Sequence, residues 1–430
     1  MMMTYQSPIS PGVSWYEASV GERPTYPVLD GSQTCDVVII GGGFTGLSAA
    51  YHLAIKGVSV ILIEQHRFGD GASGRNGGQF GTGQRAWVEE MEADVGLERS
   101  KALFQMAEDA KAHMLGFAKT HKIDMDYVPG QISAVHKKGY LKDYQAHGQI
   151  MAERYDYPHI SWMDANETAE RLGSTRYMGG TRDVGTGHIH PMKFVIGLAR
   201  AAASAGAELH ETTKATSLAS QSGKVIVGTA NGTITASKAL IATNAYGGTL
   251  EPVSASHIMP IGSFIGATEP LDDDLNIISG GESVDDSRFV VRYFRKTKDK
   301  RLLFGGREIY SASSPAEIES GVRRQITEVY PQLGDVKLTH SWGGYVGITL
   351  PRKPFVREVM PNVTSIGGYS GHGVMLSNFS GRLYAETLTG NDDKLRMLRE
   401  LKIPAFPGGR RFRTPLLFLA LNWYALMDRL

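Results

Sequence analysis

The sequence is short of cysteine and of long hydrophobic runs. Its 430 residues include one cysteine, Cys35, which excludes an intrachain disulfide and a zinc site built from cysteines. Such sparing use of cysteine is typical of a reducing compartment. The N-terminal residues show no basic region followed by an apolar core, so we expect no signal peptide and a cytoplasmic protein.

No stretch reaches the roughly 20 apolar residues of a membrane-spanning helix. The nearest is the segment 414–427, which follows the basic run Arg410, Arg411 and Arg413. We expect it to form a C-terminal helix docked on the protein, within a tail at 401–430. The alternative is a helix that makes a weak contact with a membrane surface.

Net charge is also nearly absent, because 45 Lys and Arg residues stand against 44 Asp and Glu residues, a formal net charge of +1. This balance gives no electrostatic reason to expect a nucleic-acid partner. His188 and His190 have H-x-H spacing but no third ligand in view, so no metal site is expected. No carboxylate pair or serine–histidine arrangement indicates hydrolysis.

Glycine, in contrast, is abundant, with 51 residues. The first cluster reads G-x-G-x-x-G and follows a β-branched run at 36–40. In this motif the first glycine permits a tight turn, the second lets the backbone approach a pyrophosphate, and the third lets a helix pack on the sheet. Glu64 ends the next strand, where an acid binds a ribose hydroxyl and would repel the 2′-phosphate of NADP. We therefore expect a dinucleotide to contact Gly41, Gly43, Phe44, Thr45, Gly46, Glu64 and Gln65.

Two further glycine-rich segments favour FAD over NAD. The segment 69–83 follows the second strand, and the segment 363–390 reads as a strand, a glycine loop and an amphipathic helix. A return strand at 239–242 is typical of the second half of a doubly wound nucleotide fold. Three loops are more than NAD would need, and the positive end of the last helix suits a reduced flavin. The expected contacts in these segments are Ala72, Ser73, Arg75, Asn76, Gly77, Gly78, Gln79, Thr243, Asn244, Gly368, Tyr369, Gly371, His372, Gly373 and Val374.

The remaining segments indicate a second region. Helical patterns occupy residues 86–122, hairpin strands are expected at 124–135, and residues 258–310 look antiparallel, with a solvated hairpin tip at 295–301. Period-two alternation places Arg292 between two apolar residues on one face of a strand. Arg292 is then either an inward anchor for a substrate carboxylate or an edge residue that reaches water.

Motifs along nearly the whole chain resemble one family. They are SWYEAS (14–19), CDVVIIGGGFTGLSAAYHLA (35–54), GASGRNGGQ (71–79), GHIHP (187–191), ATNAY (242–246), RLLFGG (301–306), Trp342-x-Gly, GYSGHGV (368–374) and FPGGR (406–410). The chain resembles the D-amino-acid-oxidase-like FAD oxidoreductases, and within them the gamma-glutamylputrescine oxidases.

The resemblance implies an α/β fold. An FAD-binding Rossmann-type domain, like that of glutathione reductase, is interleaved with an α+β substrate domain built on an antiparallel sheet. The implied FAD domain covers 31–90, 166–250 and 341–400, and the implied substrate domain covers 91–165 and 251–340.

The resemblance also implies the chemistry. Such enzymes oxidise a C–N bond: a hydride passes to flavin N5, the imine is hydrolysed to an aldehyde, and O2 reoxidises the flavin and gives hydrogen peroxide. The implied substrate is a small-molecule amine such as gamma-glutamylputrescine. Some relatives attach the flavin through a histidine or cysteine. Asn76 stands at that loop position and Cys35 precedes the first strand, so we expect non-covalent FAD.

Five residues are candidates for the reaction. His372 is the expected polar group beside the flavin, or else a loop histidine that only bonds to backbone. His190 lines the cavity or holds a turn. Tyr293 and Trp342 are aromatic walls or plain core, and Arg292 is the candidate partner of a substrate carboxylate.

Two other functions remain open. One is an FAD-dependent dehydrogenase of an N-methyl or D-amino acid that passes electrons to a quinone or another carrier, which the apolar C-terminal segment would favour. The other is a flavoprotein subunit of a larger complex with little turnover of its own.

Overall fold

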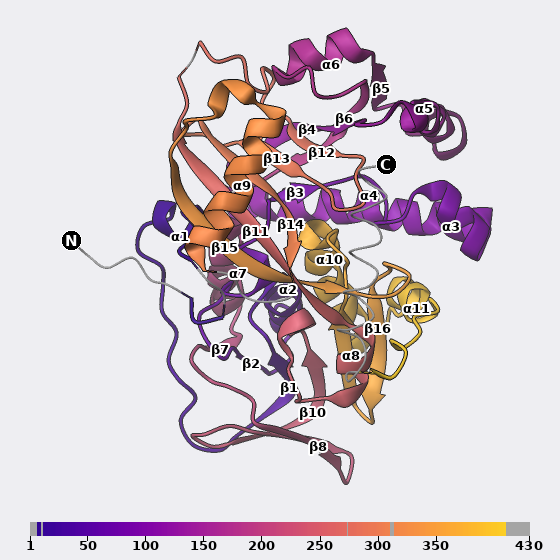
Figure 1. Cartoon of the computed structure of the whole chain (residues 1–430). Helices are drawn as coiled ribbons and strands as arrows, with labels where there is room; N and C mark the ends of the chain where they lie inside the picture. The colour runs from indigo at the N-terminus through magenta and orange to yellow at the C-terminus, as the bar shows by residue number, and fades with distance from the viewer. Residues whose placement is uncertain (1–6, 10–11, 273, 310–313, 410–430) are drawn as a thin grey trace.

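Two β-sheets organise the chain, one of eight strands and one of nine. They belong to a computed structural model that describes residues 7–9, 12–272, 274–309 and 314–409 (Figure 1). The first sheet has the order β16-β17-β10-β1-β2-β7, and β8 and β9 attach to it through β10. Its strands are β1 (Gln33–Ile40), β2 (Val60–Ile63), β7 (Glu208–His210), β8 (Ser217–Gln221), β9 (Lys224–Gly228), β10 (Thr233–Ile241), β16 (Phe355–Met360) and β17 (Val363–Gly367).

The centre of the first sheet is parallel. β1 pairs in parallel with both β2 and β10, whereas β16 is antiparallel to β17 at the edge. The β-branched run in β1 is buried on both faces, which is typical of a parallel sheet covered on both sides. This is the parallel nucleotide-binding sheet that the sequence predicts.

Helices cover one face of this sheet and a hairpin covers the other. The helical side shares one apolar core with α2 (Phe44–Ala54), α4 (Leu97–Thr120), α7 (Pro191–Ser204) and α10 (Gly373–Leu388). On the opposite face, Val225 and Val227 of β9 pack with apolar side chains of β1 and β2. A hairpin turn at Asn231-Gly232 joins β9 to β10.

The second sheet has the order β15-β11-β14-β13-β12-β4-β6-β3, and β5 attaches to β6. Helix α9 (Pro315–Val329) covers one of its faces and shares an apolar core with it (Figure 1). The strands are β3 (Gln79–Phe80), β4 (Val128–Ala134), β5 (Ile160–Met163), β6 (Gly180–His188), β11 (Met259–Pro270), β12 (Ser283–Asp286), β13 (Tyr293–Lys296), β14 (Arg301–Ile309) and β15 (Leu338–Ile348).

The two regions interleave more finely than the expected boundaries allow. β3, β6 and most of β15 fall within the ranges expected for the FAD domain, yet they belong to the second sheet. Helix α4 falls within the expected substrate domain, yet it packs in the core of the first sheet. The expected hairpin at 124–135 is a single strand, β4, which pairs with β6 and β12.

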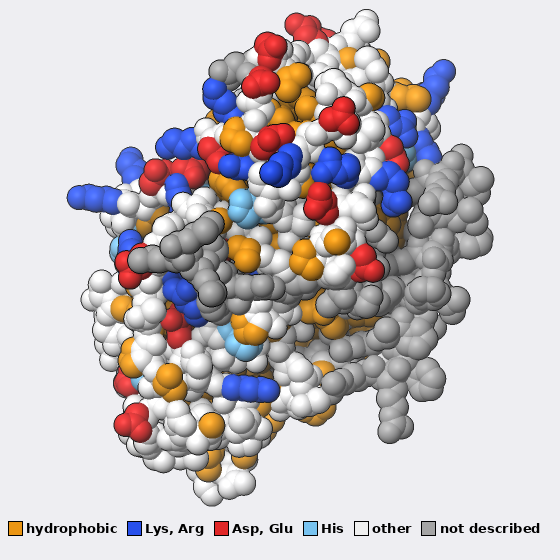
Figure 2. Space-filling model, turned by 60° about the vertical axis from the view of Figure 1, so that its left-hand side comes forward, with side chains coloured by type: hydrophobic (Ala, Val, Ile, Leu, Met, Phe, Trp, Pro, Cys, Tyr) orange, Lys and Arg blue, Asp and Glu red, His pale blue; other side chains and the backbone are white. Residues whose placement is uncertain are grey.

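The remaining α-helices of the described residues are α1 (Trp15–Ser19), α3 (Val88–Val95), α5 (Leu141–Tyr155), α6 (Ala165–Leu172), α8 (Pro252–His257) and α11 (Asp393–Arg399). Within the described part of the chain, no helix is both long and apolar enough to cross a bilayer. The segment 414–427 lies outside the described residues. On the face in Figure 2, acidic and basic side chains are intermingled and form no patch of one sign.

Candidate active site

One cavity of about 910 Å³ joins the glycine loops of the first sheet to the second sheet. Its lining includes residues of the first loop (41–46), the second loop (69–83) and the third loop (367–373). It also includes one face of strands β4, β12 and β13, which we call the roof. The three glycine clusters of the sequence therefore meet around a single space.

The first loop is a tight turn between β1 and α2 that only glycine allows. Gly41 has φ +115°, and a Cβ there would lie 2.8 Å from the carbonyl oxygen of Ala242. A Cβ on Gly46 would lie 1.9 Å from the carbonyl oxygen of Gly41. The turn leaves the first amides of α2 at the cavity, where a helix N-terminus favours a phosphate.

Glu64 lies at the end of β2 and faces the first loop. Its Oε2 accepts a hydrogen bond from the Gly42 amide at 2.8 Å, and its Oε1 accepts one from the His66 amide at 3.1 Å. Burial raises the pKa of Glu64 to about 7, although these amides oppose the rise. A carboxylate in this place can accept hydrogen bonds from ribose hydroxyls.

The second loop is held by its own side chains. Asn76 donates to the carbonyls of Ala72 and Ser73, both at 3.0 Å, and accepts from the Gly78 amide at 2.7 Å. Arg75 donates to the carbonyl of Gly343 at 2.6 Å. The arginine that we expected at the cofactor is thus tied to backbone and fixes this loop against β15.

Hydrogen bonds join the third loop to Asn244, after β10, and to helix α2. The Gly368 amide donates to Oδ1 of Asn244 at 2.8 Å. The hydroxyls of Tyr369 and Thr45 are 2.9 Å apart, which connects the third loop to α2. The loop delivers the N-terminus of α10 to the cavity wall at Gly373.

The structure gathers the expected cofactor residues, with three exceptions. Gly46, Gly78 and Gly368 do not line the cavity, and their roles are in packing and turns. The lining residues are Gly41, Gly43, Phe44, Thr45, Glu64, Gln65, Ala72, Ser73, Arg75, Asn76, Gly77, Gln79, Thr243, Asn244, Tyr369, Gly371, His372, Gly373 and Val374. These groups fit FAD, because a carboxylate that accepts hydrogen bonds, two helix N-termini that donate them, and glycine turns follow one continuous cavity.

His372 is the N-cap residue of α10 and lines the cavity. Its Nε2 lies 3.0 Å from the carbonyl oxygen of Gly83. Because a carbonyl only accepts, Nε2 carries the hydrogen and Nδ1 of the neutral ring keeps a lone pair. Burial, and then the positive charge of Arg85, lower the pKa of His372 to about 4. The ring is therefore neutral at physiological pH.

Tyr293 is the second candidate that reaches the cavity. It starts β13, and its hydroxyl lies 3.0 Å from that of Ser263 on β11. Its ring packs against Gly77 and Gly305, where any Cβ would come within 2.9 Å of it. The two glycines therefore leave room for the ring at the junction of the second loop and the roof.

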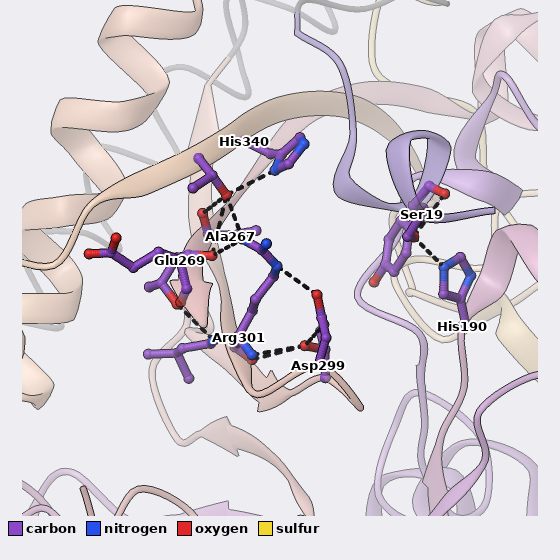
Figure 3. A network of polar contacts seen from close by, with 12 residues as sticks. Ser19, His190, Ala267, Glu269, Asp299, Arg301 and His340 are labelled. Carbon is purple, nitrogen blue, oxygen red and sulfur yellow. Dashed lines mark hydrogen bonds and ion pairs between the residues drawn. The ribbon is translucent and has the colours of Figure 1, made fainter. Parts of the chain in front are cut away.

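Trp342 and His190 are not among the residues that line the cavity. Trp342 is fully buried, and its indole nitrogen donates to the carbonyl of Arg75 at 3.0 Å. His190 is the N-cap residue of α7 and lies 3.0 Å from the hydroxyl of Ser19 (Figure 3). Trp342 is thus part of the core and His190 holds the turn before α7, which are the structural alternatives given for them in the sequence analysis.

Arg292 does not supply the expected carboxylate anchor. It lies outside the cavity lining and forms an ion pair with Glu328 of α9. Phe294, which the alternation places on the same face as Arg292, packs in the core that α9 shares with the sheet, so this face is turned to α9, whereas Tyr293 lines the cavity. At the hairpin tip, Asp299 and the carbonyl of Thr268 bind Arg301 (Figure 3).

The sequence reasoning missed the far wall of the cavity. Trp87 stacks on His147 with ring centroids 4.5 Å apart, and Tyr144 meets the same indole edge-on at 4.9 Å. Arg85 also lies beside this wall, and Asp285 lines the cavity from the roof. Arg85 stands two residues after the second loop, which is the one local signal that could have singled it out.

Potential metal ligands do not cluster anywhere in the described ranges: no three histidine, cysteine or acidic side chains are placed to hold an ion. Cys35 lies at the start of β1 and is not part of the cavity lining. Burial raises the pKa of its thiol to about 11.

Comparisons with known proteins agree with this architecture. The profile of the family "FAD dependent oxidoreductase" matches residues 36–387. A probable oxidoreductase, OrdL, of Rhizobium meliloti is 62% identical over 427 residues, which cover 99% of this chain and 100% of that protein. Gamma-glutamylputrescine oxidoreductase of Escherichia coli is 35% identical over 97% of this chain and 98% of its own length. The crystal structure of glycine oxidase from Geobacillus kaustophilus has a TM-score of 0.70 at 23% identity, covers 83% of this chain and 95% of its own, and shows the fold alone.

Proposed function

The chain belongs to the family of FAD dependent oxidoreductases, and from this premise we propose that it oxidises the C–N bond of a gamma-glutamylputrescine-like amine. The expected fold and the expected FAD are thereby confirmed, as is the assignment to the oxidoreductases. The observation that carries the choice of substrate is the identity of 35%, over nearly both full lengths, to gamma-glutamylputrescine oxidoreductase.

The cofactor would be held without a covalent bond. Glu64 would accept hydrogen bonds from the ribose, and the amides at the start of α2 would meet the pyrophosphate. The start of α10 would stabilise negative charge on the flavin ring. Asn76 offers no nucleophile at the second loop, and the thiol of Cys35 is remote from the lining and protonated.

FAD held by these residues would supply the oxidation, by accepting a hydride from the carbon beside the amine nitrogen and passing two electrons on to O2. The overall balance is one amine, one O2 and one water giving an aldehyde, ammonia and hydrogen peroxide. Water hydrolyses the imine after it forms. The task of the chain is to hold the amine in its neutral form, because an ammonium has no lone pair to assist hydride loss.

The cavity beside His372 suits a neutral amine. Burial lowers the pKa of this histidine to about 4, and burial lowers the pKa of an amine for the same reason. Nδ1 of His372 can accept a hydrogen bond from the substrate nitrogen, because Nε2 is already bonded to Gly83. Tyr293 would cover the substrate from the roof.

Anaerobic titration of the purified yellow protein tests this function. Gamma-glutamylputrescine is expected to bleach the flavin absorption band, while putrescine, sarcosine and D-alanine bleach it far more slowly. A protein that is bleached only by sarcosine or D-alanine would contradict the proposal. Each ligand would be added at equal concentration, with heat-denatured enzyme as the control for released FAD.

Admission of air then tests the acceptor. Rapid return of the flavin band, with one hydrogen peroxide formed for each amine consumed, is expected of an oxidase. Slow return in air, with fast return on adding a quinone, would assign the dehydrogenase instead. The absence of bleaching by any amine would favour a flavoprotein with little turnover of its own.

A further inference from the structure

Arg85 is a cationic side chain in the cavity that has no hydrogen-bond or ion-pair partner among the described residues. It is half-buried and lines the cavity between the second loop and the aromatic wall. It makes no hydrogen bond or ion pair with any residue in the described ranges. Of the other arginines that line the cavity, Arg75 is bonded to backbone and Arg288 is paired with Asp286. Arg85 is therefore the guanidinium that keeps its donors for a ligand.

Asp285 is the acidic counterpart on the roof. It stands in a cross-strand row between Ser133 of β4 and Tyr293 of β13. The Ser133 hydroxyl donates to Oδ1 of Asp285 at 2.7 Å, and this bond fixes the carboxylate. The buried Oε1 of Gln131, two residues before Ser133, has no hydrogen-bond partner among the described residues. The roof thus offers a carboxylate and an amide oxygen to a donor.

Arg85 and Asp285 are close but do not pair with each other. Burial raises the pKa of Asp285 and the positive charge of Arg85 opposes the rise, yet no nitrogen of Arg85 lies within 4.0 Å of a carboxylate oxygen of Asp285. Opposite charges that line one cavity without meeting leave a gap between them. A ligand with a carboxylate and an ammonium on one carbon has the charges to fill that gap.

We propose that Arg85 and Asp285 together bind the α-amino-carboxylate head group of the substrate. Arg85 takes the carboxylate, which suits the planar fork of a guanidinium. Asp285, with Gln131 beside it, takes the ammonium. This deepens the proposed function and rests on it, because a γ-glutamyl amine carries this head group at the end remote from the amine that is oxidised.

The test uses three ligands in which an ethyl group replaces the 4-aminobutyl arm that would be oxidised, and an unbleached flavin band shows that each is bound without turnover. γ-Glutamylethylamide carries both charges of the head group. Glutaric acid monoethylamide keeps the carboxylate and lacks the ammonium, and N-ethyl-4-aminobutanamide keeps the ammonium and lacks the carboxylate. Dissociation constants would be measured on the holoenzyme by calorimetry and by perturbation of the flavin absorption spectrum.

The wild-type protein should bind γ-glutamylethylamide at least about tenfold more tightly than either singly charged ligand. Arg85→Gln should weaken binding of the two carboxylate ligands by about 10- to 100-fold and leave N-ethyl-4-aminobutanamide within about twofold. Asp285→Asn should weaken binding of the two ligands that carry the ammonium by a similar factor and leave glutaric acid monoethylamide within about twofold. Arg292→Gln is the matched control and should change none of the three.

The inference is overturned if Arg85→Gln weakens all three ligands equally, or if the wild-type protein prefers a singly charged ligand. The wild-type comparison needs no variant, so a variant that fails to fold does not remove the test. If γ-glutamylethylamide binds as expected but γ-glutamylputrescine does not bleach the flavin, the head-group site stands and the proposed function fails. If γ-glutamylputrescine is oxidised while the three ligands bind alike, the proposed function stands and this inference fails.

Discussion

The binding of FAD should depend on pH through Glu64. Burial raises the pKa of this carboxyl from 4.5 to about 7, which corresponds to about 3 kcal/mol against its ionisation in the FAD-free protein. Hydrogen bonds from ribose hydroxyls to the ionised group contribute about 1.5–3 kcal/mol each, so they offset this cost. FAD should therefore bind with release of the Glu64 proton.

The raised pKa of Glu64 decides in which direction the affinity for FAD changes with pH. Below about pH 7 the FAD-free protein holds the proton, so the affinity for FAD should fall as the pH falls, by up to about tenfold per pH unit. Above about pH 7 Glu64 is already ionised and the affinity should level off. Between about pH 7.5 and 5.5 the dissociation constant should rise roughly 20-fold.

Titration of FAD-free protein, followed by the quenching of FAD fluorescence, measures this dependence. Glu64→Gln removes the titrating group and keeps the size of the side chain. It should bind FAD more weakly at high pH and lose the dependence between about pH 5.5 and 7.5. An unchanged pH dependence in Glu64→Gln, or equal affinities of the wild type at both pH values, would refute the reasoning.

Three further outcomes follow from the site. Gly46→Ala should purify with little FAD, measured by the ratio of flavin to protein absorbance, because its Cβ would lie 1.9 Å from the Gly41 carbonyl oxygen; a fully yellow variant would contradict this. Trp342→Phe should lower the free energy of unfolding in urea by about 1–2 kcal/mol, because the Arg75 carbonyl loses its indole donor, and equal stability would disprove that role. His372→Asn should slow flavin reduction without altering its pH profile between about pH 6 and 9, since the histidine is already neutral there; a displaced profile would show that the ring titrates.

The nucleotide loops could be predicted from sequence because their signals are local. Gly46 is required by a contact with Gly41 within the same turn, and Glu64 follows a short strand that ends at the same edge of the sheet. The third loop has the same strand–glycine–helix pattern. In each case the residues that explain one another lie within about 25 positions of sequence.

The roof could not be predicted because its contacts are remote in sequence. Asp285 lies on a strand of four residues, β12, too short for an alternation pattern, and its neighbour Ser133 lies 152 positions earlier. For Arg292 the sequence could place the side chain on the face of Phe294, but it could not show that α9 covers this face. Whether an arginine faces ligand or protein is decided by such distant partners, here Glu328.

The short strand β3 limits where this enzyme can be divided to make chimaeras with a relative. Its two residues belong to the second loop and pair with β6. The side chain of Gln79 donates to the carbonyls of Val284 on β12 and Phe294 on β13. The segment that wraps the cofactor is therefore also a strand of the sheet above it. A chimaera that exchanges the substrate half of two relatives must carry residues 79–80 and their partners on β6 across together. Recombination at the apparent boundary after the second loop should give protein that neither folds nor retains flavin.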